Sequence, residues 1–264
     1  TRVISFTGST DVGRKLLHAA ADNVVKPAME LGGNAPFIVC QDADLNAAAD
    51  GLMVAKMRNL GEACTAANRI YVHENVATEF VDLFVAKMAN LKMGDGRDHS
   101  IDVGPLVNLE TQDKVDYFVR DAVSKGAVIK LGGQKPVGKG FFYPPTVITN
   151  VPDTAECLSD EIFGPVAAIQ TFSDEMEIVQ RSNATEYGLV AYVYTSDMKR
   201  GMRISESLEF GMIGLNRGLV SDPASPFGGV KQSGLGREGG KEGMLEFQET
   251  QYISCLLYTS DAAD

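Results

Sequence analysis

Residues 29–39 read MELGGNAPFIV, and this stretch decides how the fold is interpreted. Its second half is a short apolar run typical of a buried strand, and this run follows two glycines. Glu30 stands at the end of an apolar strand, where a carboxylate is costly unless it is paired or functional. Burial there would raise its pKa toward that of a useful base. The pattern alone equally allows a surface glutamate on an edge strand.

Strand-like and helix-like segments alternate outward from this stretch. Strands are expected at 3–6, 37–39, 69–72, 166–172, 189–194 and 212–215. Helices are expected at 11–22, 45–60, 77–91, 111–125, 174–182 and 197–208, and in the third of these Phe80, Phe84 and Met88 lie four apart on one face. This alternation predicts an α/β fold with a largely parallel sheet. Glycine and proline are dense at 131–145 and 223–240, which predicts loops or hairpins.

Composition excludes several function classes. The 264 residues include 24 Lys and Arg against 35 Asp and Glu, and the net charge of -11 disfavours a nucleic-acid partner. No apolar run has the length of a membrane span, so no membrane partner is expected. Four scattered cysteines and three isolated histidines predict neither a disulfide framework nor a metal site. Without a secretion signal, the expected compartment is cytoplasmic.

Both ends of the sequence look unusual. The chain opens without Met on TRVISF, which resembles the inside of a strand, so we expect that an N-terminal part is missing. Residues 256–264 have no periodicity and are interpreted as a possible non-native tail, although a frayed native terminus fits equally well.

Three further segments carry residue types that chemistry could use. Residues 6–13, FTGSTDVG, join a strand to a helix, where small residues let a backbone approach a phosphate. Residues 59–69, NLGEACTAANR, set Cys64 in a loop of small residues that a substrate can reach, whereas Cys40 and Cys157 look like packing residues. Residues 159–166, SDEIFGPV, place acids and an aromatic ring before a strand. Each segment taken alone is more often structural, and GLGREG at 234–239 is interpreted as a false dinucleotide motif.

In this order, and with PFGGVKQSG at 226–234, these segments resemble the aldehyde dehydrogenase superfamily over residues 1 to about 254. The resemblance implies an aldehyde dehydrogenase-like catalytic domain with a parallel-rich sheet, plus the remaining pieces of a Rossmann-like cofactor domain. The expected divisions are 1–33 for the end of the cofactor-binding domain, 34–232 for the catalytic domain and 233–247 for the return to the cofactor domain. Residues 248–255 would form an oligomerisation segment whose strand is expected at 249–254. Residues 256–264 would be the possible tail.

The resemblance also implies roles for single residues. Cys64 matches the nucleophile and Glu30 the general base. The residues that match the site for NAD or NADP are Gly8, Ser9 and Gly13 at the phosphate turn, Leu31 and Gly32 at the nicotinamide, Glu161 at the ribose, and Phe163 beside the ring. Such enzymes oxidise an aldehyde through a cysteine thioester.

Within the superfamily the chain most resembles succinate-semialdehyde dehydrogenases. Arg58 and Ser221 match residues that hold the distal carboxylate of the substrate, and a guanidinium fork suits that task. Arg217 replaces an expected small polar residue and could reinforce carboxylate binding or shift the preference to another semialdehyde. A full-length enzyme of this kind is expected to be a homodimer or homotetramer.

Other interpretations stay open. A glutarate-semialdehyde dehydrogenase or another aldehyde dehydrogenase fits the same motifs. A truncated, non-catalytic fragment fits them too, and the chain by itself is not expected to turn over. A cysteine hydrolase that uses Cys64 and Glu30 without a redox cofactor is the third alternative.

Overall fold

The computed structural model describes residues 1–256, and its main feature is a seven-stranded sheet. The strand order is β5-β6-β7-β4-β3-β8-β9, and every neighbouring pair is parallel except the antiparallel pair β5–β6. These strands are β3 (Ala35–Val39), β4 (Ala67–His73), β5 (Val128–Leu131), β6 (Thr146–Thr149), β7 (Val166–Phe172), β8 (Val190–Tyr194) and β9 (Met212–Leu215). The predicted α/β fold with a parallel-rich sheet is therefore confirmed.

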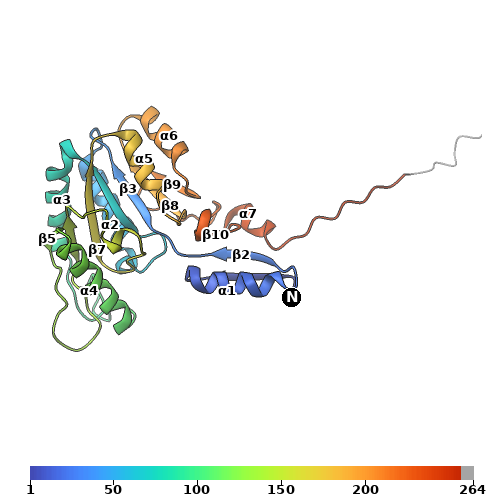
Figure 1. Cartoon of the computed structure of the whole chain (residues 1–264), viewed down its shortest axis with the longest axis horizontal. Coiled ribbons are helices and arrows are strands. Elements are labelled where there is room, and N and C mark those ends of the chain that lie inside the picture. The colour runs from blue at the N-terminus through green and yellow to red at the C-terminus, as the bar shows by residue number, and fades with distance from the viewer. Residues whose placement is uncertain (257–264) are drawn as a thin grey trace, which may run out of the picture.

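Helices cover both faces of this sheet (Figure 1). On one face lie α2 (Leu45–Met57) and α3 (Ala77–Ala89), and on the other lie α4 (Leu109–Ser124), α5 (Glu175–Asn183) and α6 (Met198–Ser207). All residues of β3 and β8 are buried, since a parallel strand between two helical layers has no face in water. This double burial is why PFIV has no alternation of apolar and polar residues.

A second, smaller sheet stands beside the large one (Figure 1). It contains β1 (Val3–Thr7) and β2 (Lys26–Glu30), which are parallel, and β10 (Gly234–Leu235), which pairs antiparallel with β2. Its helices are α1 (Thr10–Ala21) and α7 (Gly240–Leu245). The chain passes from β2 to β3 through residues 31–34 alone, so the end of β2 lies where the two sheets meet.

Side-chain caps set where most of the helices begin. Asp44 accepts a hydrogen bond from the Ala47 amide at 3.0 Å, and Asn108 accepts one from the Thr111 amide at 2.8 Å. Asp174 and Asp197 do the same for α5 and α6. These residues satisfy amides that a helix cannot pair within itself, so they mark helix starts in the sequence.

Two local expectations were wrong or incomplete. The helix expected at 45–60 ends at Met57, because the residues of the next turn, η1 (Arg58–Gly61), include a left-handed run that cannot continue a right-handed helix. The Gly/Pro-rich stretch at 131–145 does lie in a hairpin, but its strands β5 and β6 were not foreseen. Residues 249–254 pair with no strand among the described residues, so the expected strand between copies of the protein stays a prediction.

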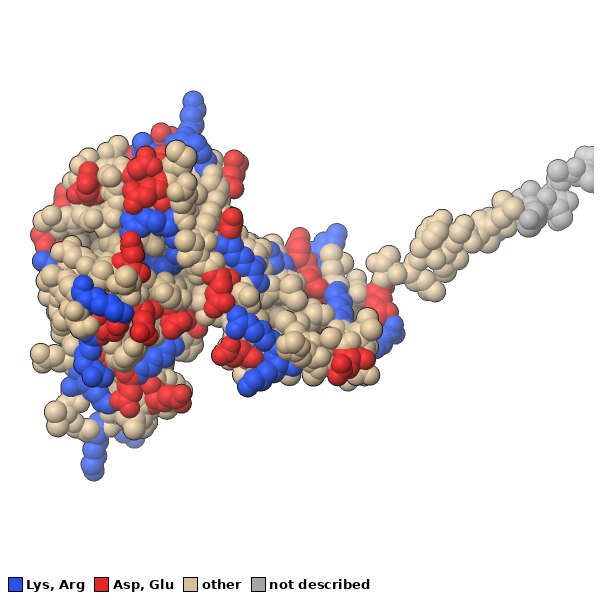
Figure 2. All heavy atoms as spheres, viewed as in Figure 1, with Lys and Arg blue, Asp and Glu red and all other residues tan. Residues whose placement is uncertain are grey.

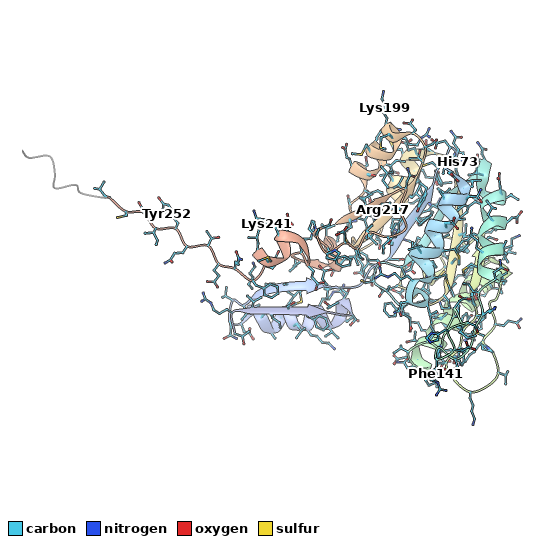
Figure 3. The ribbon with its side chains drawn as sticks, turned by 180° about the vertical axis from the view of Figure 1, so that it is seen from behind. His73, Phe141, Lys199, Arg217, Lys241 and Tyr252 are labelled. Carbon is cyan, nitrogen blue, oxygen red and sulfur yellow. The ribbon has the colours of Figure 1, made fainter. Side chains whose placement is uncertain are left out.

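The remaining elements are short 3₁₀ turns: η2 (Glu74–Val76), η3 (Glu156–Leu158) and η4 (Lys231–Ser233). On the face shown in Figure 2, acidic and basic side chains are intermixed over both sheets. Tyr252 lies on an extended terminal segment that projects from the small sheet (Figure 3). Among residues 1–256, no helix combines the length and the apolar character needed to cross a membrane. The expected tail at 256–264 lies, beyond Leu256, outside the described residues.

The centre of β3 should carry a large share of the stability. Phe37 is fully buried and stacks on Tyr194 with 5.0 Å between the ring centroids. Phe37→Ala should lower the free energy of unfolding by about 3–5 kcal/mol, through lost burial and an unfilled cavity. Urea unfolding measures this, with the fully exposed Val137→Ala as control. An effect of Phe37→Ala no larger than that of the control would contradict this core.

Candidate active site

A cavity of about 740 Å³ opens where the small sheet meets the loop after α2 and the segment before β7. Its lining brings together all the site residues expected from the sequence except Gly13: Gly8, Ser9, Glu30, Leu31, Gly32, Arg58, Cys64, Glu161, Phe163 and Ser221. These residues come from five separated parts of the chain. Only the packing of the two sheets against each other places them around one space.

Cys64 lies half-buried in the loop between α2 and β4. A hydrogen bond fixes this loop to β8, since the Tyr192 hydroxyl donates to the Thr65 carbonyl at 2.9 Å. The loop also packs closely against residues 31–34, which connect the two sheets: a Cβ on Gly33 would lie 2.3 Å from the Cys64 carbonyl oxygen. Only glycine permits this approach, so Gly33 sets how close the thiol comes to the end of β2.

The pKa of the Cys64 thiol is raised to about 11, mostly by burial and then by the nearby Glu161 and Glu30 carboxylates, in that order of size. Near neutral pH the thiol therefore keeps its proton. Since the thiolate is the nucleophilic form, this site needs a base that removes the proton as the sulfur attacks.

Glu30 ends β2 with its carboxylate buried in the same region. Neither carboxylate oxygen has a hydrogen-bond partner among the described residues. Burial raises the pKa of Glu30 to about 8, the Glu238 carboxylate adds to the rise, and the Arg237 guanidinium opposes it. An acid with a pKa near the working pH can accept and release a proton, which is what a general base requires. The surface-glutamate alternative is thereby wrong.

Glu161 and Phe163 face the cavity from the segment before β7. The Gly33 amide donates to Glu161 at 3.3 Å, which keeps this carboxylate at the junction of the sheets. Phe163 adopts a left-handed backbone with φ 55°, an uncommon conformation for an aromatic residue that persists where surrounding contacts impose it.

Gly13 lies elsewhere. It is buried in α1, its amide donates within the helix to the Ser9 carbonyl at 3.0 Å, and a Cβ there would lie 2.5 Å from Leu31 Cδ2. Its amide is therefore already paired, and the missing side chain lets α1 pack against Leu31. Gly13 does not line this cavity, whereas Gly8 and Ser9 do, and its place in the phosphate turn stays a prediction.

Arg58 and Ser221 also line the cavity, and Arg58 is exposed there without an ion pair to any described residue. Arg217 is exposed and lies outside the cavity lining, so the structure gives no support to a second guanidinium at this site. Figure 3 places Arg217 on the loop that follows β9.

Sequence reasoning missed the neighbours of Glu30. Glu238 and Arg237 lie in GLGREG, which was set aside as a false motif. Here its glycines permit close approach: a Cβ on Gly234 would lie 1.9 Å from the Met29 carbonyl, as β10 pairs with β2. Arg237 and Glu238 follow shortly after β10, and nothing in the sequence indicated that they would lie near Glu30. Glu62 was missed too, and it lines the cavity while accepting from the Val107 amide at 3.0 Å.

Comparisons with known proteins agree with this geometry. The model of the "Aldehyde dehydrogenase family" matches residues 1–253. A succinate-semialdehyde dehydrogenase of Paenarthrobacter nicotinovorans is 54% identical over 96% of this chain and 56% of its own length. A glutarate-semialdehyde dehydrogenase of Pseudomonas aeruginosa is 46% identical over 97% of this chain and 53% of its own. The resemblance seen in the sequence is thereby confirmed.

Among solved structures, an E. coli NADP dependent enzyme superposes with a TM-score of 0.94 at 43% identity, covering 96% of this chain and 53% of that one. The chain spans about half the length of the curated relatives it matches.

The pKa of Glu30 makes stability depend on pH. The folded acid keeps its proton to about pH 8, whereas an unfolded glutamate loses it near 4.5. This group's contribution is thus fully present below pH 4.5 and is lost as the pH rises toward 8. Glu30→Gln should remove the loss, so its advantage in unfolding free energy over the natural protein should grow from pH 5 to pH 8.

Urea unfolding at several pH values measures that difference. Glu238→Gln should reduce the dependence in part, because it removes the second cause of the raised Glu30 pKa. The exposed Glu79→Gln serves as control and should leave the dependence unchanged. Parallel curves for Glu30→Gln and the natural protein would refute the assignment.

Proposed function

Because the chain belongs to the aldehyde dehydrogenase family, we propose that the full-length protein oxidises an aldehyde to a carboxylic acid, with NAD or NADP as oxidant and a thioester on Cys64. The observation that carries this proposal is the pairing of Cys64 with an unpartnered, buried Glu30 in one cavity. A nucleophile and a base of suitable pKa are the two groups that such chemistry requires.

The lining around Gly32 fits a nicotinamide ribose by its chemistry. A Cβ on Gly32 would lie 3.2 Å from the Tyr187 ring and 3.4 Å from Glu161 Oε2, so the absence of a side chain at Gly32 leaves space in this part of the cavity. Glu161 would accept hydrogen bonds from ribose hydroxyls, and Leu31 and Phe163 would offer apolar surface to the ring. Gly8 and Ser9 would approach the phosphates at the start of α1. When bound, the cofactor supplies the acceptor for the hydride.

The chain's own residues perform the remaining steps. Cys64 Sγ attacks the aldehyde carbon, and Glu30 can take the thiol proton that burial would otherwise hold on the sulfur. Loss of a hydride from the resulting thiohemiacetal leaves a thioester on Cys64. Glu30 then deprotonates a water that attacks the thioester, which releases the acid and restores the thiol. This order requires Glu30 to give up its first proton to solvent before hydrolysis.

We further propose that the aldehyde carries a distal carboxylate, with succinate semialdehyde first and glutarate semialdehyde second. Arg58 supports this, because it lines the cavity that holds Cys64 and makes no ion pair with any other described residue. Ser221 would add a hydroxyl donor to the same carboxylate. The names of the two curated relatives are consistent with a semialdehyde of this class.

The divisions of the chain remain proposals as well. The presence of two separate sheets supports a division into the pieces of a cofactor-binding domain, 1–33 and 233–247, and a catalytic domain, 34–232. Tyr252 and Ile253 are largely exposed on the extended segment that follows. We propose that 248–255 pairs with another copy of the protein in a homodimer or homotetramer.

The proposed function is tested by mixing full-length protein, succinate semialdehyde and either NAD or NADP. Reduced nicotinamide should accumulate, and Cys64→Ala should lower the rate by at least about a thousandfold, since the covalent step is lost. The exposed Ser173→Ala lies outside the cavity lining, serves as the control and should keep full activity. Retained turnover in Cys64→Ala would remove the nucleophile, and ester hydrolysis without cofactor dependence would favour a cysteine hydrolase.

Arg58→Ala tests the substrate. It should raise KM for succinate semialdehyde by about tenfold or more, the cost of one charge-assisted contact, and change KM for an uncharged aldehyde of similar length little. Arg217→Ala removes an exposed guanidinium outside the cavity and serves as the matched control. Equal effects of Arg58→Ala on both aldehydes would exclude the carboxylate contact.

A further inference from the structure

Lys56 is a buried lysine that the proposed chemistry does not use. It lies in the last turn of α2 with no exposed surface, and its Nζ donates to Asn68 Oδ1 at 3.0 Å. Asn68, on β4, is itself 1% exposed. Placing an ammonium group in the interior is costly unless its contacts compensate, so a lysine at this position calls for a physical explanation.

The two partners stand at the two ends of the loop that carries Cys64. We call residues 57–67 the nucleophile loop. It contains a run of left-handed backbone at Asn59, Leu60 and Gly61, with φ of 50°, 59° and 77°. Such conformations cost about 1–2 kcal/mol at each non-glycine residue and persist only where the surroundings impose them. The hydrogen bond between Lys56 and Asn68 joins the residue just before the nucleophile loop to the residue just after it.

Above that bond the nucleophile loop fits its neighbours backbone to backbone. A Cβ on Gly61 would lie 2.3 Å from the Gly164 carbonyl oxygen and 3.2 Å from that of Lys56. On the other side the Cys64 carbonyl touches Gly33, as described above. With so little free space, a change at the base of the loop must displace the thiol relative to Glu30 and Glu161.

Electrostatics points the same way. Burial lowers the pKa of Lys56 to about 7, and the Cys157 thiol and the Glu161 carboxylate act against that fall. In return the Lys56 charge is one of the influences that lower the pKa of Glu161, after the Gly33 amide and Lys114, against the rise caused by burial. Lys56 is therefore in electrostatic contact with the segment that faces the nucleophile loop.

We propose that Lys56 is a positioning residue, which fastens the two ends of the nucleophile loop through Asn68 and thereby sets the position of Cys64 Sγ in the cavity. The inference rests on the proposed function only in taking Cys64 as the nucleophile. The alternative hypothesis is that Lys56 only stabilises the fold and does not set the position of Cys64.

Two variants separate these roles in the full-length protein. Lys56→Met removes the donor and keeps the length of the side chain. The double variant Lys56→Met/Asn68→Leu also removes the amide that would be left unpaired, so its thermal stability should return close to that of the natural protein. Lys87→Met, which breaks the Lys87–Asp50 ion pair between α3 and α2, controls for the loss of a lysine near the same helix.

The primary measurement is the rate at which iodoacetamide alkylates each cysteine, followed by peptide mass. The rate for Cys64 in the natural protein is the reference, while buried Cys40 and Cys157 report global opening. A loosened loop hydrates Cys64 and relieves the burial that raises its pKa. We therefore expect Cys64 to react at least about threefold faster in Lys56→Met and in the double variant, with Cys40 and Cys157 still protected.

Turnover of the aldehyde should fall at the same time by about tenfold or more, with KM changed less than kcat, because the reacting geometry is lost. A faster thiol with slower turnover is not expected from a purely stabilising residue. The double variant decides the case if Lys56→Met unfolds. The proposal is overturned if Cys64 alkylation and turnover in the double variant stay within about twofold of the natural protein. Should Cys64→Ala keep its turnover, the proposed function fails, whereas the alkylation rates still test Lys56.

Discussion

The close approach of the Cys64 carbonyl to Gly33 is the contact on which the rest of the site depends. Residues 31–34 are the direct passage from the small sheet to the large one, and the nucleophile loop rests on that passage with no room for a side chain between them. Because Glu30 ends β2 and Cys64 precedes β4, this single contact brings two distant parts of the sheet topology to one cavity. Rigid strands on either side hold them there, which a flexible linker could not do.

The same packing creates the electrostatic character of the cavity. Glu30, Glu161 and Cys64 are all acids in the lining of the cavity, and burial is the largest cause of the raised pKa of each. Their mutual repulsion adds to it at Cys64. The consequence is a site in which Cys64 and Glu30 hold their protons near neutral pH, and in which removing one proton makes the next removal harder. An acceptor poised near pH 8 suits this setting better than an ordinary carboxylate would.

The compensating positive charge lies at the edges of the site. Arg237 acts on Glu30 from the β10 side, while Lys114 and Lys56 act on Glu161. Of these, only Lys56 has no exposed surface, and it is the one attached to the nucleophile loop by a hydrogen bond. Stability and chemistry thus use the same buried contacts, so the strain in residues 59–61 is kept by the groups that also define the cavity.

The sequence by itself determined the α/β class, the course of most strands and helices, and the identity of the groups around the cavity. It could do so because period, capping residues and small-residue turns are local: Asp44 and Asn108 start their helices whatever lies elsewhere. Tertiary structure decided the rest. Whether Glu30 is exposed or buried depends on residues 228–238, some two hundred positions along the chain. The left-handed turn after Met57, the packing role of Gly13 and the burial of Lys56 likewise follow from contacts between distant backbones, which no local pattern records.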